Sequence, residues 1–243
     1  MYHHVRNLPQ NAGRMSRTLT VTASEFEDQI AYLAREGYHT VYFSDLIDYF
    51  RSGTPLPAKP VIITFDDGWA EQYAVAYPIL RRYCMAATFF PPTDWLNHSS
   101  LTLTWREVEE MSRAGMEFGS HTVNHHLMTQ ESAGEIARQL ETSRAILQRR
   151  VPRPVLALAY PGGAVNAAVE LQAAAAGYGV AVGVRGGTRQ TPAERFRLHR
   201  TAIVYGSTLQ EFARKLKPQE GETVSAAAAA RDARHARFIN EDP

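Results

Sequence analysis

A repeated alternation of two kinds of segment restricts the fold of this chain more than any other feature. Short apolar runs rich in β-branched and aromatic residues predict strands, and longer runs with apolar residues three or four positions apart predict helices. The predicted strands cover residues 39–46, 61–65, 86–90, 116–120, 154–160 and 178–184. The predicted helices cover residues 22–37, 45–53, 74–84, 104–115, 132–150, 166–177 and 207–216. Such alternation is typical of a parallel sheet, and the number of units favours an α/β barrel over an open sheet.

The size and charge of the chain narrow its class further. With 243 residues, of which 44% are hydrophobic, it can bury a sizeable core, and an α/β barrel of this length commonly forms one domain. A net charge of +1 provides no basic field of the kind that nucleic-acid-binding proteins carry. No apolar run in the sequence approaches the length needed to span a membrane. We therefore expect one globular unit without a nucleic-acid partner or a membrane-spanning segment.

The composition of the chain changes near residue 218. Residues 219–243 are rich in alanine and polar side chains, with Arg231, Arg234 and Arg237 at three-residue spacing. Such a segment is typical of an exposed helix or a flexible tail, and an arginine stripe is usually a solvated face. We therefore expect a barrel domain over residues 1–218 and an Ala/Arg-rich polar tail over residues 219–243.

Two features bear on the cellular compartment. Cys84 is the single cysteine, which excludes an internal disulfide and a cysteine-based metal cluster, and its apolar neighbours predict a buried side chain. The N-terminal residues lack the charged and apolar regions of a signal peptide. Either the protein is cytosolic, or its export signal is not in this chain.

Polar or glycine-rich sequences directly follow three of the predicted strands. Asp66, Asp67 and Gly68 follow the strand at 61–65; "HTVNHH" follows the strand at 116–120; and "PGG" follows the strand that ends at Tyr160. The carboxyl ends of the strands of a parallel barrel meet at one rim, where functional groups gather. We therefore expect these three sequences to lie close together.

The residue types in these sequences indicate metal-dependent chemistry. His121 and His125 are four residues apart, so that two imidazoles can reach one cation, and a carboxylate from another strand end would complete a three-ligand site. Such a site keeps positions open for a water molecule that the metal activates near neutral pH. Successive side chains leaving a strand point in opposite directions, so one of Asp66 and Asp67 can bind the metal while the other acts as a general base.

Each motif alone also has an interpretation without chemistry. An Asp-Asp-Gly sequence after a strand is often a turn in which Gly68 supplies the positive φ. A His-x-x-x-His pair such as His121 and His125 is often a pair of surface or core histidines. The presence of all three motifs in this order favours the metal site over these alternatives.

The same motifs carry a family resemblance. "TFDDG", "SHTVNH" and "AYPGG", in this order and spacing, resemble the signature of the polysaccharide deacetylase family, which contains the NodB homology domain of carbohydrate esterase family 4. The similarity extends from "YHHV" at Tyr2 to "LQEFARKL" and includes "KPVIITFDDGW", "ATFF", "LTWREVEEM" and "GMEFGSHT". Within the family, the chain is most similar to the branch that includes deacetylases of poly-N-acetylglucosamine.

The resemblance implies a fold, a reaction and roles for particular residues. The family fold is a distorted, incomplete (β/α) barrel, and its reaction is the metal-dependent hydrolysis of an N-acetyl group on an amino sugar, which releases acetate. By position in the motifs, the general base is Asp66. The metal ligands are Asp67, His121 and His125, and the metal is usually zinc, with other divalent ions able to substitute. Substrate-binding positions by the same comparison are Tyr160, Pro161 and Gly162, where the Gly162 N–H would face the oxyanion. The implied partner is an N-acetylated polysaccharide or oligosaccharide.

The chain departs from the family pattern at two places. Ala159 occupies the position of an arginine that orients the base in the family, and the residue that replaces this arginine is not evident from the sequence. The family places a histidine after a leucine on a late strand as general acid, whereas this chain has "FRLHRTAIV". His199 is then either that acid or a surface histidine, and Arg200 is an equally plausible polar contributor.

Three functional hypotheses follow. The first is a metal-dependent deacetylase of N-acetylglucosamine polymers, which the complete set of Asp66, Asp67, His121 and His125 favours. The second is a catalytically weakened barrel that binds polysaccharide without hydrolysing it. The absence of the family's arginine at Ala159 keeps this hypothesis open. The third keeps the chemistry but changes the substrate to an O-acetylated sugar or a small amide. Because relatives generally act outside the cytoplasm, we expect an extracytoplasmic protein that is exported by a signal absent from this chain.

Overall fold

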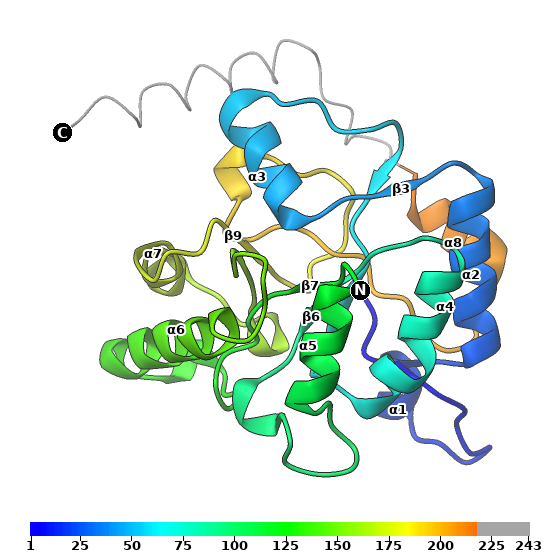
Figure 1. Cartoon of the computed structure of the whole chain (residues 1–243), viewed down its shortest axis with the longest axis horizontal. Coiled ribbons are helices and arrows are strands. Elements are labelled where there is room, and N and C mark those ends of the chain that lie inside the picture. The colour runs from blue at the N-terminus through cyan, green and yellow to red at the C-terminus, as the bar shows by residue number, and fades with distance from the viewer. Residues whose placement is uncertain (218–243) are drawn as a thin grey trace.

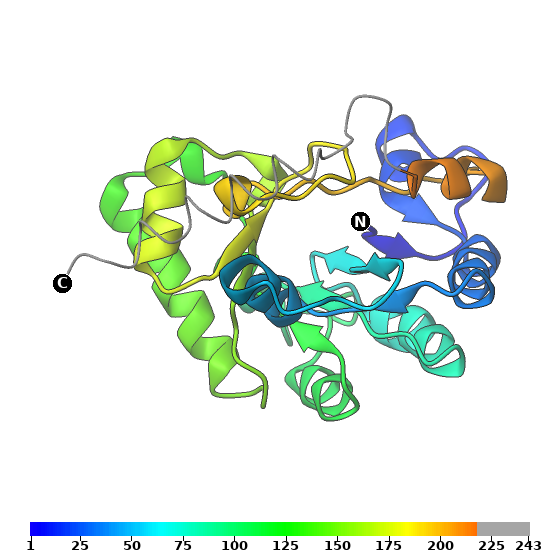
Figure 2. The same ribbon diagram turned by 90° about the horizontal axis from the view of Figure 1, so that it is seen from above.

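The computed structural model describes residues 1–217, and the remaining residues lie outside the described part of the chain. Helices surround a central group of short strands (Figures 1 and 2). The helices are α1 (Arg14–Leu19), α2 (Ala23–Arg35), α3 (Phe43–Ser52), α4 (Tyr77–Arg82), α5 (Trp105–Arg113), α6 (Ala133–Gln148), α7 (Ala167–Ala175) and α8 (Leu209–Lys215). The strands are β1 (His4–Val5), β2 (Thr20–Val21), β3 (His39–Thr40), β4 (Pro60–Val61), β5 (Thr64–Asp66), β6 (Thr88–Phe90), β7 (Glu117–Phe118), β8 (Ala157–Ala159) and β9 (Val180–Val182).

All the paired strands are parallel, as the alternation predicts. The order β5–β6–β7 forms one sheet, and β1–β2, β3–β4 and β8–β9 form separate pairs. Isolated parallel bridges connect Tyr2 with Phe65, Ser120 with Leu158, and Val182 with Leu198. Regular pairing is interrupted between the sheets, so the strands of residues 1–217 do not form a closed barrel. The predicted α/β class with parallel strands is confirmed.

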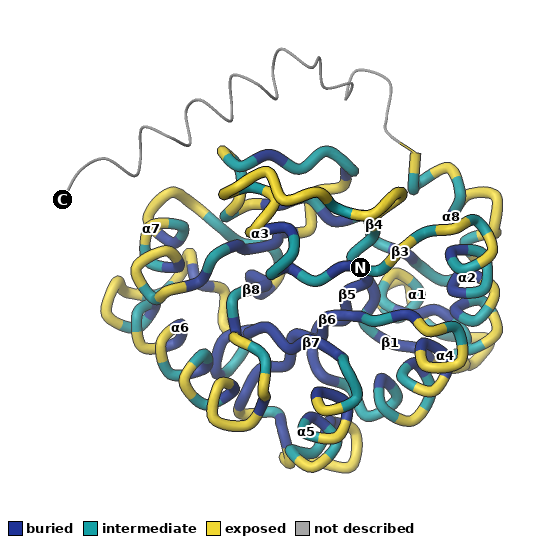
Figure 3. Tube along the Cα trace, turned by 45° about the horizontal axis from the view of Figure 1, so that its top comes forward, coloured by how far each residue is buried: buried dark blue, intermediate teal, exposed yellow. Residues whose placement is uncertain are grey.

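An aromatic layer packs the central strands against the helices. Phe65 of β5 stacks on Phe89 of β6 with ring centroids 4.8 Å apart, and Phe26 of α2 covers Phe65 at 5.6 Å. These three rings are fully buried, so each contributes about 1.5–3 kcal/mol by its removal from water. Figure 3 shows the buried positions concentrated on the strands and on the inner sides of the helices. Because successive side chains of a strand point to opposite faces, Asp66 points away from this layer.

The predicted helices begin within a few residues of their sequence signals, helix α1 is absent from the prediction, and the strands are shorter than predicted. Thr22 caps α2 through a capping box with Glu25, a device that contributes about 1 kcal/mol. The strand predicted over residues 39–46 is reduced to β3, because α3 already begins at Phe43. There the Tyr42 N–H donates to the carboxylate of Asp45. The strand predicted over residues 61–65 is divided into β4 and β5.

The prediction of a buried Cys84 is wrong. Helix α4 ends at Arg82, and Cys84 lies in the turn that follows, with a φ of 54° and an exposed side chain. This left-handed turn directs Met85, which is 6% exposed, into the core in its place. The thiol is therefore accessible to solvent.

Two further expectations concern membranes and the tail. Within residues 1–217, the helices lack the combination of length and apolar character that crossing a bilayer requires. The predicted tail over residues 219–243 lies outside the described residues.

Candidate active site

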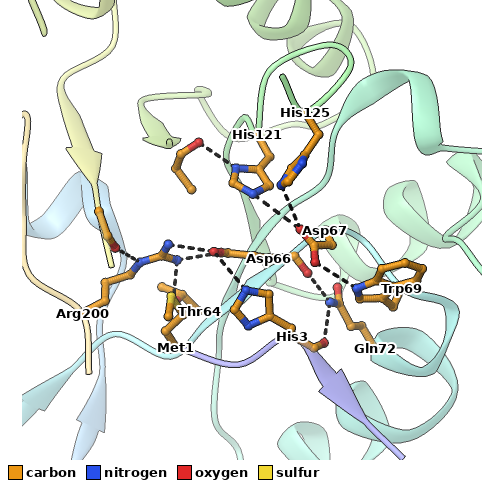
Figure 4. Close-up of polar contacts among 12 residues, drawn as sticks. Met1, His3, Thr64, Asp66, Asp67, Trp69, Gln72, His121, His125 and Arg200 are labelled. Carbon is orange, nitrogen blue, oxygen red and sulfur yellow. Dashed lines mark hydrogen bonds and ion pairs between the residues drawn. The ribbon is translucent and has the colours of Figure 1, made fainter. Parts of the chain in front are cut away.

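Polar side chains from separate strand ends meet at one place in the structure (Figure 4). Asp66 is the last residue of β5, and Asp67 follows it. His121 and His125 lie in the loop that begins after β7. The structure therefore brings together the Asp-Asp-Gly and His-x-x-x-His motifs, which are far apart in the sequence.

Asp67, His121 and His125 form a compact set of potential metal ligands, the donor set. The Nε2 atoms of His121 and His125 lie 3.5 and 3.4 Å from Oδ1 of Asp67. One donor atom from each residue lies within 4.8 Å of the other two. Two imidazole nitrogens and one carboxylate oxygen suit zinc and leave further coordination positions open. The chemistry and spacing of these atoms therefore fit a divalent metal ion.

The orientation of His121 is set by the backbone of β8. Its Nδ1 lies 2.7 Å from the carbonyl oxygen of Ala159, and the side chain is almost completely buried. Because a carbonyl oxygen can only accept, Nδ1 carries the proton of this hydrogen bond, and in the neutral ring Nε2 keeps its lone pair toward Asp67. Ala159 thus fixes the tautomer that metal binding through Nε2 requires.

The backbone around the donor set is held in an unusual conformation. Asp67, Thr122 and His125 have φ values of 73°, 67° and 65°, in the left-handed region that residues other than glycine rarely adopt. At Gly68, where φ is 70°, a Cβ atom would lie 2.7 Å from the Cβ of Pro91. Backbone strain of this kind is costly and clusters at functional sites, where the surrounding structure imposes it.

The ionisable groups of the donor set influence one another. Burial raises the pKa of Asp67, but the hydrogen bond and charge of His121 more than offset this, and the pKa lies below its ordinary value. Burial lowers the pKa of His121, but the hydrogen bond to Asp67 and the nearby carboxylates raise it above its ordinary value. Burial and the charge of His121 lower the pKa of His125. Metal binding through Nε2 requires a neutral imidazole, and the raised pKa of His121 favours the protonated ring, so we expect metal affinity to decrease as the pH falls.

Asp66 is paired with an arginine from a distant part of the chain. The Nη1 and Nη2 atoms of Arg200 donate to Oδ1 and Oδ2 of Asp66 at 2.6 and 2.7 Å, and Nε donates to the carbonyl oxygen of Gly183 at 2.8 Å. Asp66 is 2% exposed and Arg200 is 6% exposed. Burial raises the pKa of Asp66, but the charges of Arg200 and His121 and the hydrogen bonds from Arg200 lower it well below its ordinary value. Asp66 is therefore ionised throughout the neutral pH range.

His3 lies on another side of Asp66 and is a residue that sequence reasoning did not select. Its Nε2 is 4.0 Å from Oδ2 of Asp66, and its side chain is 16% exposed. Gln72 holds the two segments together, because its Nε2 donates to the carbonyl oxygens of His3 and Asp66 at 2.9 and 2.6 Å. Burial lowers the pKa of His3, although the charges of Asp66 and Asp67 act in the opposite direction. The "YHHV" stretch, part of the family resemblance, is the signal that could have pointed to His3.

The predicted substrate-binding residues Tyr160, Pro161 and Gly162 differ in their exposure to solvent. Tyr160 is fully buried, and its hydroxyl donates to the carbonyl oxygen of Phe196 at 2.9 Å, so its ring cannot face a substrate. Pro161 is also buried, whereas Gly162 is exposed with a φ of 60°. A Cβ atom at Gly162 would lie 2.9 Å from Cδ2 of Leu127. Substrate contact at these positions remains a prediction, and at Tyr160 it is restricted to the backbone.

His199 lies apart from the donor set. Its backbone N–H and carbonyl oxygen are hydrogen-bonded to the side chain of Gln190, and its ring nitrogens are buried without a partner among the described residues. His199 lines a cavity of about 670 Å³ together with apolar residues such as Leu198 and Phe212 and with the neighbouring Arg200. Asp67, His121 and His125 do not line this cavity. The prediction that the "FRLHR" stretch contributes to the site therefore holds for Arg200, and no contact of His199 supports it.

Comparison with known proteins identifies the family. The model of the family described as polysaccharide deacetylase matches residues 53–181, which is more than half of the chain. This chain belongs to the polysaccharide deacetylase family. The resemblance inferred from the motifs is confirmed, and so is the predicted enzyme class, because the family consists of hydrolases that act on amide bonds.

Individual relatives are similar to this chain at moderate sequence identity. The poly-β-1,6-N-acetyl-D-glucosamine N-deacetylase of Staphylococcus epidermidis is 28% identical over 186 residues, which cover 68% of this chain and 64% of that protein. The enzyme of the same name from Escherichia coli (strain K12) is 31% identical over 132 residues, which cover 48% of this chain and 20% of that protein. The chain therefore spans only part of the length of these curated relatives.

A solved structure extends the similarity to the fold of the chain. The Streptococcus pyogenes deacetylase PplD, solved in complex with acetate, matches with a TM-score of 0.83 and 27% identity. The match covers 89% of this chain and 96% of that one. Nearly all of the described residues thus share the arrangement of a known deacetylase.

Proposed function

We propose that the protein hydrolyses the N-acetyl group of an N-acetylglucosamine-containing polysaccharide and releases acetate. One observation carries the proposal: the buried Asp66–Arg200 pair lies directly beside the donor set of Asp67, His121 and His125. An ionised carboxylate next to a site for a divalent ion is the combination that amide hydrolysis by an activated water requires. PplD, solved with acetate, and the poly-N-acetylglucosamine deacetylases support the choice of reaction and substrate class.

The metal in this proposal is zinc, held by Asp67, His121 and His125. Nitrogen and oxygen donors of this kind suit zinc, although other divalent ions accept the same donors. A bound zinc ion would act as a Lewis acid on the acetyl carbonyl and lower the pKa of water. The protein contributes a fixed His121 tautomer and a backbone that holds the donors before the metal arrives.

Asp66 is the general base in this proposal. Arg200 holds the carboxylate by both oxygens, which fixes its direction and keeps it ionised. Each carboxylate oxygen has a further lone pair, so Asp66 can accept a proton while the hydrogen bonds to Arg200 remain. Arg200 thereby supplies the orienting charge that Ala159 cannot, which weakens the hypothesis of a non-hydrolysing barrel.

His3 is the general acid that protonates the leaving amine in this proposal. Its Nε2 lies 4.0 Å from Oδ2 of Asp66, so the proton that Asp66 would take from water can reach the His3 ring, and the partly exposed imidazolium formed there would donate it to the amine. His199 is the candidate from the sequence, but its ring nitrogens have no hydrogen-bond partner among the described residues, and the histidine that lies near Oδ2 of Asp66 is His3. The position of His3 therefore supports it over His199.

The Gly162 N–H is the proposed oxyanion donor. Among the described residues, Gly163 and Ala164 donate backbone hydrogen bonds to Tyr160 and Pro161, whereas Gly162 is exposed and its N–H donates none to the backbone. A free, preorganised N–H is the kind of group that stabilises a developing oxyanion. Tyr160, Pro161 and Gly162 would then form one wall of the substrate groove.

Three further parts of the proposal concern the whole protein. We propose that residues 1–218 form the catalytic unit and that its strands are those of a distorted, incomplete (β/α) barrel. We also propose that the protein acts outside the cytoplasm, where its polymeric substrate would be found. Detection of the native protein only in a cytosolic fraction would contradict the last point.

The function is tested by acetate release from N-acetylglucosamine oligomers. We expect chelator-stripped protein to release no acetate and zinc to restore release, because the base alone does not activate water sufficiently. Tight zinc binding without release from any oligomer would contradict the proposal. Release from O-acetylated sugars or small amides alone would favour the alternative substrates.

A pair of histidine variants tests the assignment of the general acid. His3→Gln is expected to lower kcat about 100-fold, since a positioned acid contributes on the order of 10²–10⁴. His199→Gln is the matched control and is expected to leave kcat unchanged. The measurement is acetate release by zinc-loaded protein under saturating oligomer. A loss in His199→Gln with a normal His3→Gln would assign the role to His199.

A further inference from the structure

The carboxylate of Asp67 is held at both of its oxygens. Oδ1 faces the Nε2 atoms of His121 and His125, whereas Oδ2 accepts a hydrogen bond from the indole Nε1–H of Trp69 at 3.1 Å. Figure 4 shows Trp69 on the side of Asp67 opposite to the two histidines. The two oxygens of one carboxylate are thus divided between the donor set and an indole.

Trp69 is itself supported by neighbouring groups. The ring of His4 stacks on the indole with centroids 4.5 Å apart and an interplanar angle of 29°. His4 is 8% exposed, and its Nδ1 lies 2.6 Å from Oε1 of Glu71. The indole also contacts the ring of Trp95 at 5.7 Å. Rotation of the indole away from Asp67 would break these contacts, so the direction of its N–H is fixed.

From this geometry we infer that Trp69 is a positioning residue for metal binding. Its N–H holds Oδ2, so that Oδ1 would be the oxygen directed to a bound metal, and His4 and Glu71 keep the indole in place. The torsion of a carboxylate about its last bond is broad, so an unsupported Asp67 would sample orientations that do not suit the two histidines. A group that hydrogen-bonds to a metal ligand in this way typically contributes about 10- to 100-fold to metal affinity. The inference depends on the metal site proposed above.

Trp105 offers a matched control. It is the first residue of α5, is half-buried like Trp69, and packs against the guanidinium of Arg150, whose Cζ lies 5.3 Å from the ring centroid. Among the described residues, the hydrogen bond to Oδ2 of Asp67 comes from Trp69 and a ring contact to His125 comes from Trp95. Substitution of Trp105 therefore makes the same change of side chain without altering either of these contacts.

The test is the zinc dissociation constant of Trp69→Phe, Trp105→Phe and wild-type protein, measured by competition with a chromophoric chelator. Trp69→Phe is expected to weaken zinc binding about 10- to 100-fold, and Trp105→Phe is expected to bind as wild type. The visible absorption of the cobalt-loaded protein should also change in Trp69→Phe, because Asp67 is free to rotate. Equal zinc affinity in Trp69→Phe and wild type would overturn the inference. Failure of wild type to bind zinc would instead overturn the proposed metal site.

A measurement on the wild-type protein covers the case in which Trp69→Phe does not fold. The chain has 3 tryptophans, so its indole N–H resonances in proton–nitrogen NMR spectra can be assigned with Trp95→Phe and Trp105→Phe. We expect the Trp69 N–H to exchange slowly with solvent in zinc-loaded protein, because it stays bonded to Oδ2. Rapid exchange of this proton would show that the hydrogen bond is not maintained and would overturn the inference.

Discussion

Asp66→Asn is expected to reduce kcat for acetate release by a factor on the order of 10⁴, the upper end of what general acid–base catalysis contributes. An amide cannot accept the proton that Asp66 would remove, and its NH₂ group cannot replace a carboxylate oxygen opposite the Arg200 guanidinium. The measurement is kcat with N-acetylglucosamine oligomers and zinc-loaded protein. Zinc affinity should be retained, because the donor set is provided by Asp67, His121 and His125.

Asp94→Asn serves as the control for this prediction. Asp94 is an exposed aspartate just after β6, and the same substitution there is expected to leave kcat unchanged. If Asp66→Asn binds zinc normally and keeps more than about a tenth of the activity, Asp66 is not the base. The proton would then have to be accepted by another group beside the donor set.

Arg200→Met is expected to destabilise the protein by about 3–5 kcal/mol near neutral pH, the usual cost of leaving a buried charge without its partner. Asp66 is 2% exposed, so water cannot replace the two hydrogen bonds from Arg200. The measurement is urea unfolding of chelator-treated protein, so that the metal does not contribute. We also expect acetate release to fall, because the base loses its fixed direction.

The loss of stability in Arg200→Met should depend on pH in a defined direction. In the wild type the pKa of Asp66 lies below its ordinary value of 3.8, so the pair stabilises the fold above that pH and this contribution is lost as the pH falls through the lower folded-state pKa. Without Arg200, burial raises the pKa of Asp66, and the folded variant gains a proton that relieves the buried charge. The stability difference between the two proteins should therefore be larger at neutral pH than at a pH of about 4.

Arg197→Met is the control for this second prediction. The Arg197 side chain is 51% exposed and pairs with Glu170, and an exposed pair of this kind contributes about 0–1 kcal/mol. It lies in the same stretch of chain as Arg200, so general effects of the substitution would affect both variants. A pH-independent loss in Arg200→Met, or an equal loss in Arg197→Met, would show that the Asp66–Arg200 pair is not the source.

The Asp66–Arg200 pair also explains how the chain tolerates Ala159. Position 159 is the last residue of β8, whereas Arg200 lies in a segment that follows β9 and reaches Asp66 from there. The small side chain at Ala159 is fully buried, while its carbonyl oxygen orients His121. In this chain Arg200 therefore supplies the guanidinium at Asp66, and the backbone of Ala159 orients His121.

Local patterns predicted the elements of the fold and part of the site. Helical periodicity and capping pairs located helices such as α2 and α5, because a helix is stabilised largely by residues within a few positions of one another. Strand lengths were overestimated at residues 39–46, where α3 begins early against the core. The exposure of Cys84 was also missed, because the direction of a side chain in a turn depends on a single φ angle.

The alternation of parallel strands and helices, the family, and the motifs containing Asp66, Asp67, His121 and His125 could all be inferred from the sequence alone. These features depend on residue type and on spacing along the chain, which a sequence displays directly. Three contacts became evident from the folded structure: Arg200 pairs with Asp66, His3 lies beside Asp66, and Trp69 holds Oδ2 of Asp67. The first two contacts join residues that are far apart in the chain, and the third depends on the direction of one indole ring. Such contacts are created by the packing of strands and loops, and no local pattern of residues records them.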